Sequence, residues 1–177
     1  MIWAVAYRVP GGRIGGGATG KAGRRVNLFH STVINKIDSK GRLSVPSGFR
    51  SVLAAAGSPG LYCYPSLDEM TLEACSERKM QQIDNMISKL QATVAKKLRR
   101  KIFGEGEMLL FDPEGRVRPS PALLAKKGIT DEVMFVGLGN TFQLWNPAHY
   151  ADEGLITDED VGELVAAFDS LTLPAEV

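Results

Sequence analysis

The sequence predicts an α+β fold built from two copies of one small unit. Three observations lead to this class. The run Asp38-Ser39-Lys40-Gly41-Arg42-Leu43 returns as Asp112-Pro113-Glu114-Gly115-Arg116-Val117, at an offset of 74 residues. Each run lies between short apolar stretches that are typical of β-strands, and an amphipathic helical stretch follows the first copy. With 177 residues, 44% of them hydrophobic, the chain can bury a core of its own.

Each unit begins with a strand, a tight turn and a returning strand, which together predict a β-hairpin. In the first unit the strand covers 32–37, the turn 38–41 and the return 42–45, where Pro46 ends it. We then expect, in chain order, a helix at 47–56, a loop at 57–60, a strand at 61–64 and a long helical region at 67–103. The apolar positions of that region are spaced to form one face that packs on the strands: Met80, Ile83, Met86, Ile87, Leu90 and Val94.

The second unit repeats this order without a long helical insertion. Its strand covers 107–111, its turn 112–115, and its return begins at Arg116; a short helix at 122–127 ends at Gly128. Strands at 132–136 and 141–145 follow, joined by a turn at 137–140, and 158–171 is expected to form a short acidic amphipathic helix. The expected organisation is a disordered Gly/Arg-rich extension (1–26), a first repeat with its helical region (27–103), a second repeat (104–150) and an acidic tail (151–177).

Charge is distributed unevenly along a chain whose net charge is only +1. Residues 1–30 carry five basic residues and no acidic one, and 151–177 carry eight acidic residues and no Lys or Arg. The part between them holds 16 basic and 12 acidic residues, a mild excess that suits a protein that meets a polyanion. The apolar start at 1–7 is too short to span a membrane and lacks the preceding basic residues of a signal peptide. These features predict a cytoplasmic protein.

The repeated turn has a clear physical logic. An Asp at its start accepts hydrogen bonds from backbone N–H groups of the turn, and Gly41 or Gly115 tolerates the positive φ that closes it. The Arg that follows then leaves the turn in a fixed direction, from which it can bind phosphate or the edge of guanine. The alternative interpretation is that Arg42 only pairs with Asp38 across the turn as a structural staple.

Both runs resemble a known family. Residues 35–50, from Asn35-Lys36-Ile37-Asp38 to Ser47-Gly48-Phe49-Arg50, resemble the first repeat of MraZ proteins, and Phe111-Asp112-Pro113-Glu114-Gly115-Arg116-Val117 resembles the second. Gly137-Leu138-Gly139-Asn140-Thr141-Phe142-Gln143-Leu144-Trp145 is similar to the segment that closes the second repeat of that family. The resemblance extends over about 27–150, and its motifs are long, paired and correctly ordered.

The resemblance implies a swapped-hairpin fold of the AbrB-like kind, with two pseudo-symmetric repeats in a barrel and helices packed on its outside. It further implies a homo-oligomeric ring, associated with the nucleoid, that binds direct repeats in double-stranded DNA upstream of the division and cell-wall gene cluster and represses it. Carried over by position, the residues that face DNA are Arg42 and Arg116, with Lys40 as a phosphate contact. Asp38, Gly41, Asp112 and Gly115 shape the two turns. Exposed hairpin edges also predict that the chain is not monomeric.

The second repeat departs from the family pattern. Arg118-Pro119-Ser120-Pro121 stands where an apolar pair and a proline are expected, and Leu124 takes the place that Arg50 holds in the first repeat. The second turn is therefore expected to bind DNA more weakly or in an altered register, with Arg118 as a compensating phosphate contact.

Other patterns leave alternatives open. The glycines of 15–21 match the opening of a nucleotide-binding loop, but Ala22 replaces the Ser or Thr that would bind magnesium. Deletion of 1–25 would separate this nucleotide-binding enzyme, which would lose its activity, from a DNA-binding repressor, which would keep its binding. An antitoxin-like interaction module would instead show a bound partner protein. The basic run 96–101 is either a DNA contact or a set of cations that complements a helix dipole.

Metal, disulfide and catalytic chemistry find little support in the sequence. Two cysteines, Cys63 and Cys75, form neither a disulfide framework nor a zinc motif, and they suit a reducing compartment. Two histidines, His30 and His149, lack partners at ligand spacing, and no hydrolase or protease signature is present. We therefore expect no cofactor, no metal and no enzymatic activity. We expect Tyr64 and Trp145 to pack in the core or in a subunit interface, and not to stack on nucleic-acid bases.

Overall fold

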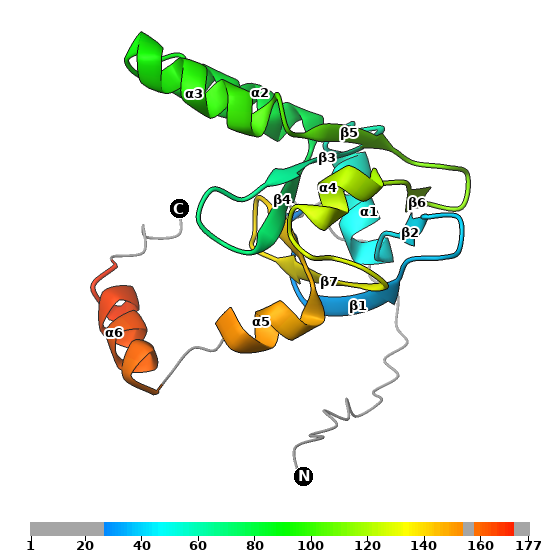
Figure 1. The fold of residues 1–177 in the computed structure, drawn as a ribbon. Helices are drawn as coiled ribbons and strands as arrows, with labels where there is room; N and C mark the ends of the chain where they lie inside the picture. The colour runs from blue at the N-terminus through cyan, green and yellow to red at the C-terminus, as the bar shows by residue number, and fades with distance from the viewer. Residues whose placement is uncertain (1–26, 154–157, 172–177) are drawn as a thin grey trace, which may run out of the picture.

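The computed structural model describes residues 27–153 and 158–171, and its fold is α+β, as the sequence predicts (Figure 1). Six strands form one antiparallel sheet in the order β1-β7-β8-β4-β3-β5, and β2 pairs with β6 in a separate two-stranded sheet. Their bounds are β1 (Thr32–Lys36), β2 (Leu43–Ser44), β3 (Gly60–Pro65), β4 (Thr71–Cys75), β5 (Glu107–Leu110), β6 (Arg116–Val117), β7 (Glu132–Gly137) and β8 (Phe142–Trp145). Because β1 and β5 are edge strands, the sheet is not closed into the expected barrel.

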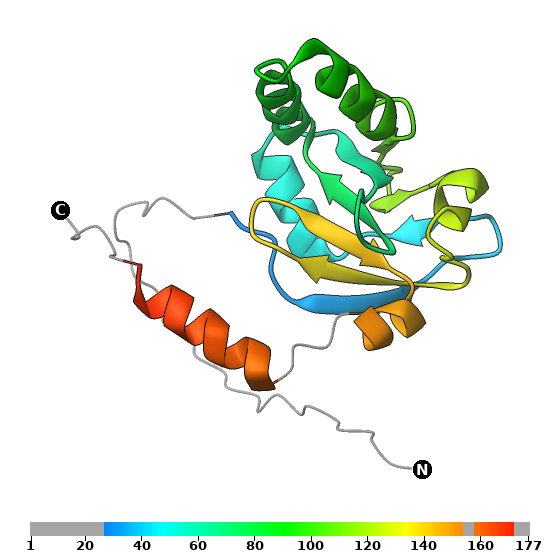
Figure 2. The same cartoon turned by 60° about the vertical axis from the view of Figure 1, so that its left-hand side comes forward.

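Six helices accompany the strands in the described ranges. They are α1 (Ser47–Ala55), α2 (Glu77–Ile87), α3 (Ala92–Ile102), α4 (Pro121–Ala125), α5 (Pro147–Glu153) and α6 (Asp158–Asp169). α2 and α3 lie side by side as a helical hairpin at the β5 side of the sheet, and α5 lies at the opposite side, near β1 and β7 (Figures 1 and 2). α6 confirms the predicted tail helix, whereas α5 was not expected from the sequence. In the described part of the chain no helix has the length and apolar character needed to cross a membrane.

The two halves of the chain exchange strands. The predicted hairpins are wrong as paired units. Beyond the turn itself, β1 and β2 are linked by the Ile37–Leu43 bridge and by a hydrogen bond from the Asn35 side chain to the Ser44 carbonyl, and they form no ladder. β1 instead pairs with β7 and β2 with β6, both from the second half, while β5 of the second half pairs with β3 of the first. This exchange is the kind of swapped arrangement that the family resemblance implies.

The region 67–103 is not one long helix. Its start contains β4, a central strand between β3 and β8, with Leu72 and Ala74 fully buried. α2 begins where the Ser76 hydroxyl accepts the backbone N–H of Lys79, and α2 and α3 are separate helices. The predicted apolar face is correct for Met80 and Ile87, which are buried, and for Ile83, which is half-buried. It is wrong for three residues near the turn of the helical hairpin, which are exposed: Met86, Leu90 and Val94.

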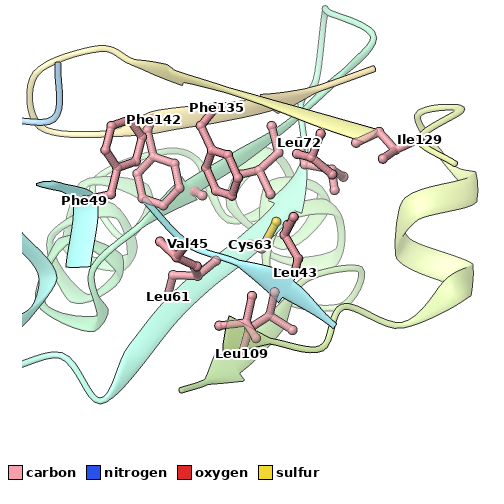
Figure 3. Close-up of a cluster of buried hydrophobic side chains, with 14 of the residues drawn as sticks. Leu43, Val45, Phe49, Leu61, Cys63, Leu72, Leu109, Ile129, Phe135 and Phe142 are labelled. Atoms are coloured by element: carbon pink, nitrogen blue, oxygen red, sulfur yellow. The ribbon is translucent and has the colours of Figure 1, made fainter. Parts of the chain in front are cut away.

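The main core lies between the six-stranded sheet and the layer formed by β2, β6 and α1. Leu43 and Val45 point from the β2 segment toward Leu61 and Leu109, while Phe49, Phe135 and Phe142 pack together at one end (Figure 3). Buried side chains therefore pack against one face of the two-stranded β2–β6 sheet. This packing fixes the position of the turn that precedes each of its strands.

A second, smaller cluster joins the helical hairpin to the sheet. It contains Cys75, Met80, Ile87, Ala95 and Ile102, with half-buried Tyr62 and Tyr64 packed against it. The residue Trp145 is buried in β8, and its indole N–H donates a hydrogen bond of 2.8 Å to Gln143. These aromatic residues pack within the fold, as expected, while the predicted disorder of 1–26 lies outside the described residues.

Candidate nucleic-acid interface

The first turn, residues 38–42, is organised by the carboxylate of Asp38. Its Oδ1 accepts the backbone N–H groups of Lys40 and Arg42, each at 2.9 Å. Gly41 donates its N–H to the Asp38 carbonyl at 2.9 Å and adopts a φ of 73°, a conformation that other L-residues rarely take. The local sequence thus fixes the direction in which Arg42 leaves the turn.

The second turn, residues 112–116, has the same backbone and the same hydrogen bonds. Asp112 Oδ1 accepts the N–H groups of Glu114 at 3.0 Å and Arg116 at 2.8 Å. Gly115 donates to the Asp112 carbonyl at 3.0 Å and has a φ of 76°. The internal repeat seen in the sequence is therefore a repeat of turn geometry.

Each turn arginine forms an ion pair with the aspartate of its own turn. Arg42 directs Nε and Nη2 to Asp38 Oδ2, both at 2.7 Å. Arg116 directs Nε to Asp112 Oδ2 at 2.7 Å and Nη2 to Glu114 at 2.8 Å. The pairing on which the staple interpretation depends is thus present in both turns. The Arg42 and Arg116 side chains still keep 27% and 24% of their surface exposed.

These contacts hold the charges of the site constant near neutral pH. Hydrogen bonds from the Arg42 side chain and backbone lower the pKa of Asp38 from 3.8 to about 2. For Asp112, desolvation raises the pKa, but the hydrogen bonds and charge of Arg116 outweigh it and the pKa is lowered. The same pairing raises the pKa of Arg116. Both carboxylates are therefore ionised above about pH 4, and the guanidinium of Arg116 remains charged.

The pairing of β2 with β6 places the two turns side by side. Leu43 lies opposite Val117 and Ser44 opposite Arg116, and the N–H of Val45 reaches the carbonyl of Gly115 at 3.3 Å. Figure 1 shows both loops emerging together at one end of the molecule. One surface thus receives an arginine from each half of the chain.

The remaining predicted site residues lie at the same surface. Continuing the β2–β6 register by one residue beyond the Leu43–Val117 pair places Arg118 opposite Arg42. Arg118 and Lys40 are both exposed. The structure therefore brings together all four basic residues that the sequence singled out.

Arg50 is a fifth basic residue of this surface, and its position was not foreseen. It extends from α1 of the first half onto the second turn, where a Cβ added to Gly115 would collide with its Nη1 and come within 2.8 Å of its Cδ. Its Nε is buried and has no hydrogen-bond partner among the described residues. The available signal was the comparison of repeats, because Leu124 occupies the equivalent position 74 residues later.

The other basic cluster lies at the C-terminal end of α3, away from the turns. Arg99, Arg100 and Lys101 occupy its last turn, where cations complement the helix dipole. Arg99 pairs with Asp84 at 2.8 Å, and Lys101 pairs with Glu105 at 2.8 Å. Part of this cluster is therefore already engaged within the molecule.

Metal and thiol chemistry have no site in the described part of the chain. No group of three His, Cys, Asp or Glu side chains there could hold a metal ion. Cys63 and Cys75 are both buried and free, and burial raises the pKa of Cys75 to about 12, so its thiol stays protonated. The glycine-rich stretch at 15–21 lies outside the described residues.

Comparison with known proteins gives a consistent set of relatives. The chain is 44% identical over 133 residues to the transcriptional regulator MraZ of Xanthobacter autotrophicus, a match that covers 72% of this chain and 85% of the relative. It is 42% identical over 125 residues to that of Pelagibacter ubique, with 70% and 81% covered, and 42% over 129 residues to that of Parvibaculum lavamentivorans, with 71% and 80% covered. No protein-family model matches the chain.

Proposed function

The chain belongs to the MraZ family of transcriptional regulators, a family of regulators and not of enzymes, and from this premise we propose that it binds double-stranded DNA through its two arginine turns. Arg42 and Arg116 contact the DNA, and Lys40 and Arg118 bind phosphates beside them. The observation that carries the proposal is the β2–β6 pairing, which presents one turn arginine from each half on a single surface. Its target is a set of direct repeats upstream of the division and cell-wall gene cluster, which the bound protein represses in the cytoplasm, at the nucleoid.

The geometry suits recognition of a rigid polyanion. In each turn the aspartate holds the Nε side of the guanidinium, so the side chain does not have to be ordered when DNA arrives. A guanidinium fixed in this way can bind phosphate or the O6 and N7 atoms of guanine in a bidentate manner. The surface carries five basic residues, Lys40, Arg42, Arg50, Arg116 and Arg118, against the three carboxylates of Asp38, Asp112 and Glu114. Its net charge therefore favours DNA.

We further propose that the chain assembles into a ring-shaped homo-oligomer. β1 and β5 are edge strands, and they expose apolar side chains: Ile34 is 49% exposed, Met108 37% and Leu110 62%. Pairing through such edges would place several arginine pairs along one DNA molecule, so that weak contacts add up. Sedimentation at micromolar concentration should show species larger than a monomer, and a 19 kDa species alone would contradict the proposal.

A direct binding measurement tests the function. The purified protein is titrated with the duplex upstream of its own gene and with a scrambled duplex of equal length and composition. We expect tighter binding to the native duplex, and log K should fall against log salt by about 0.9 for each phosphate contacted. Equal affinity for the two duplexes, or affinity that does not change between low and physiological salt, would exclude this mode of binding.

A further inference from the structure

α6 presents an apolar face that nothing in the described structure covers. Val161, Leu164, Val165 and Phe168 are spaced as i, i+3, i+4 and i+7, and they are 46% to 69% exposed. The segment 151–177 around them carries eight acidic residues and no Lys or Arg. Figures 1 and 2 show α6 standing away from the sheet. It is an acidic amphipathic helix whose apolar side still requires a partner.

The helical hairpin carries a groove of the opposite charge. One face of α3, together with the turn before it, lines a hollow of about 670 Å³, with the small residues Ala92 and Ala95 at its base and Leu90 at its end. Lys96, Arg99 and Arg100 form its rim. Arg99 is paired with Asp84, whereas no ion-pair partner in the described structure engages Lys96 or Arg100.

We propose that α6 of one copy docks into the α3 groove of a second copy. The bulky side chains of α6, such as Phe168, pack over the small residues at the base of the groove and against Leu90. Acidic side chains at the two edges of this face, Asp160 and Asp169, then lie near Lys96 and Arg100. Apolar burial supplies the attraction and charge complementarity sets the orientation.

The partner is a second copy because the groove of the same chain lies at the other side of the sheet. Residues 154–157 join α6 to α5, which packs against β7, while α2 and α3 pack against β3, three strands further along the sheet. A link of this length spans at most about 18 Å when fully extended. Three strand spacings already use about 14 Å of this reach. The helical hairpin that carries the groove lies further from α5, because it projects beyond the sheet (Figure 1).

Cross-linking in the full-length protein tests the contact. One tagged version carries Leu164→Cys and a differently tagged version carries Leu90→Cys; the native cysteines are buried. After mixing and mild oxidation we expect a disulfide between the two versions. Ala166→Cys, which lies on another side of α6, should give far less product and serves as the matched control. Equal yields from Leu164→Cys and Ala166→Cys would overturn the proposal.

Charge reversal provides a second test of the contact between α6 and the groove. In the Leu90→Cys version, Lys96→Glu with Arg100→Glu should abolish the cross-link, and Asp160→Lys with Asp169→Lys in the Leu164→Cys version should restore it. All four side chains are exposed, so the fold is not at risk. If a chain carrying both cysteines closes the disulfide within itself at high dilution, or if charge reversal leaves the yield unchanged, docking between two copies is wrong.

Discussion

The two arginine turns have the same backbone but different surroundings. At the position of Lys40 in the first turn, the second turn has Glu114, whose carboxylate pairs with Arg116 at 2.8 Å. Arg50 covers Gly115 of the second turn, whereas a Cβ at Gly41 would meet no atom within 4 Å. The first turn is thus more basic and open, and the second is braced.

This difference indicates that the two repeats have divided their work. Arg42 is tied to one carboxylate and has Lys40 beside it, so it is the better placed of the two arginines to meet DNA. Arg116 is tied to two carboxylates, and Arg50 covers Gly115, the residue before it. Arg116 therefore both stabilises its own turn and contacts DNA. Two turns with the same backbone geometry do not have to give their side chains equal roles.

The largest expected effect separates the two arginines. Arg42→Ala should weaken binding to the promoter duplex about 10- to 100-fold, as the loss of one good bidentate contact does. Arg116→Ala should weaken binding less but lower the melting temperature more, because two carboxylates lose their partner. Fluorescence anisotropy at matched salt and thermal unfolding measure both quantities. An equal loss of affinity in the two variants would contradict the proposal that the two arginines contribute unequally to DNA binding.

Alanine at the two turn glycines gives the next effect. Gly41→Ala should cost about 1–2 kcal/mol of unfolding free energy, since alanine at positive φ is strained. Gly115→Ala should cost more, because it must also displace Arg50. Urea unfolding measures the two values. In an Arg50→Ala background the excess cost should disappear, and an excess that persists would show that Arg50 does not brace the second turn.

Exchange of the charges at the turn tips gives the smallest effect. Glu114→Lys should strengthen DNA binding a few-fold and steepen the salt dependence by about 0.9 if one more phosphate is contacted. Lys40→Glu should do the reverse. Both side chains are exposed, so stability should change little. Tighter binding by Lys40→Glu than by the parent would place the first turn away from the DNA.

The sequence was most informative where structure depends on local chemistry. The Asp, Gly and Arg of each turn predict the observed hydrogen bonds and positive φ, because these depend only on residues within the turn. The tail helix was visible in the spacing of Val161 and Leu164 for the same reason.

Features that depend on distant partners were not predictable. Strand exchange could not be read from the hairpin signals, since β1 and β2 pair with strands about 70 to 100 residues away. The sequence predicts helix where β4 lies, because burial on both faces of a central strand removes the polar and apolar alternation. The contact between Arg50 and Gly115 links α1 to the second turn and exists only in the folded chain.

The double variant Arg42→Ala/Arg116→Ala tests the central claim most directly. Its affinity for the promoter duplex is measured at the same salt concentration as that of the parent, and circular dichroism follows its unfolding. We predict that its affinity falls to that of the parent for scrambled DNA, while unfolding remains cooperative. Parent-like affinity for the promoter duplex in a folded double variant would show that the two arginines only staple their turns.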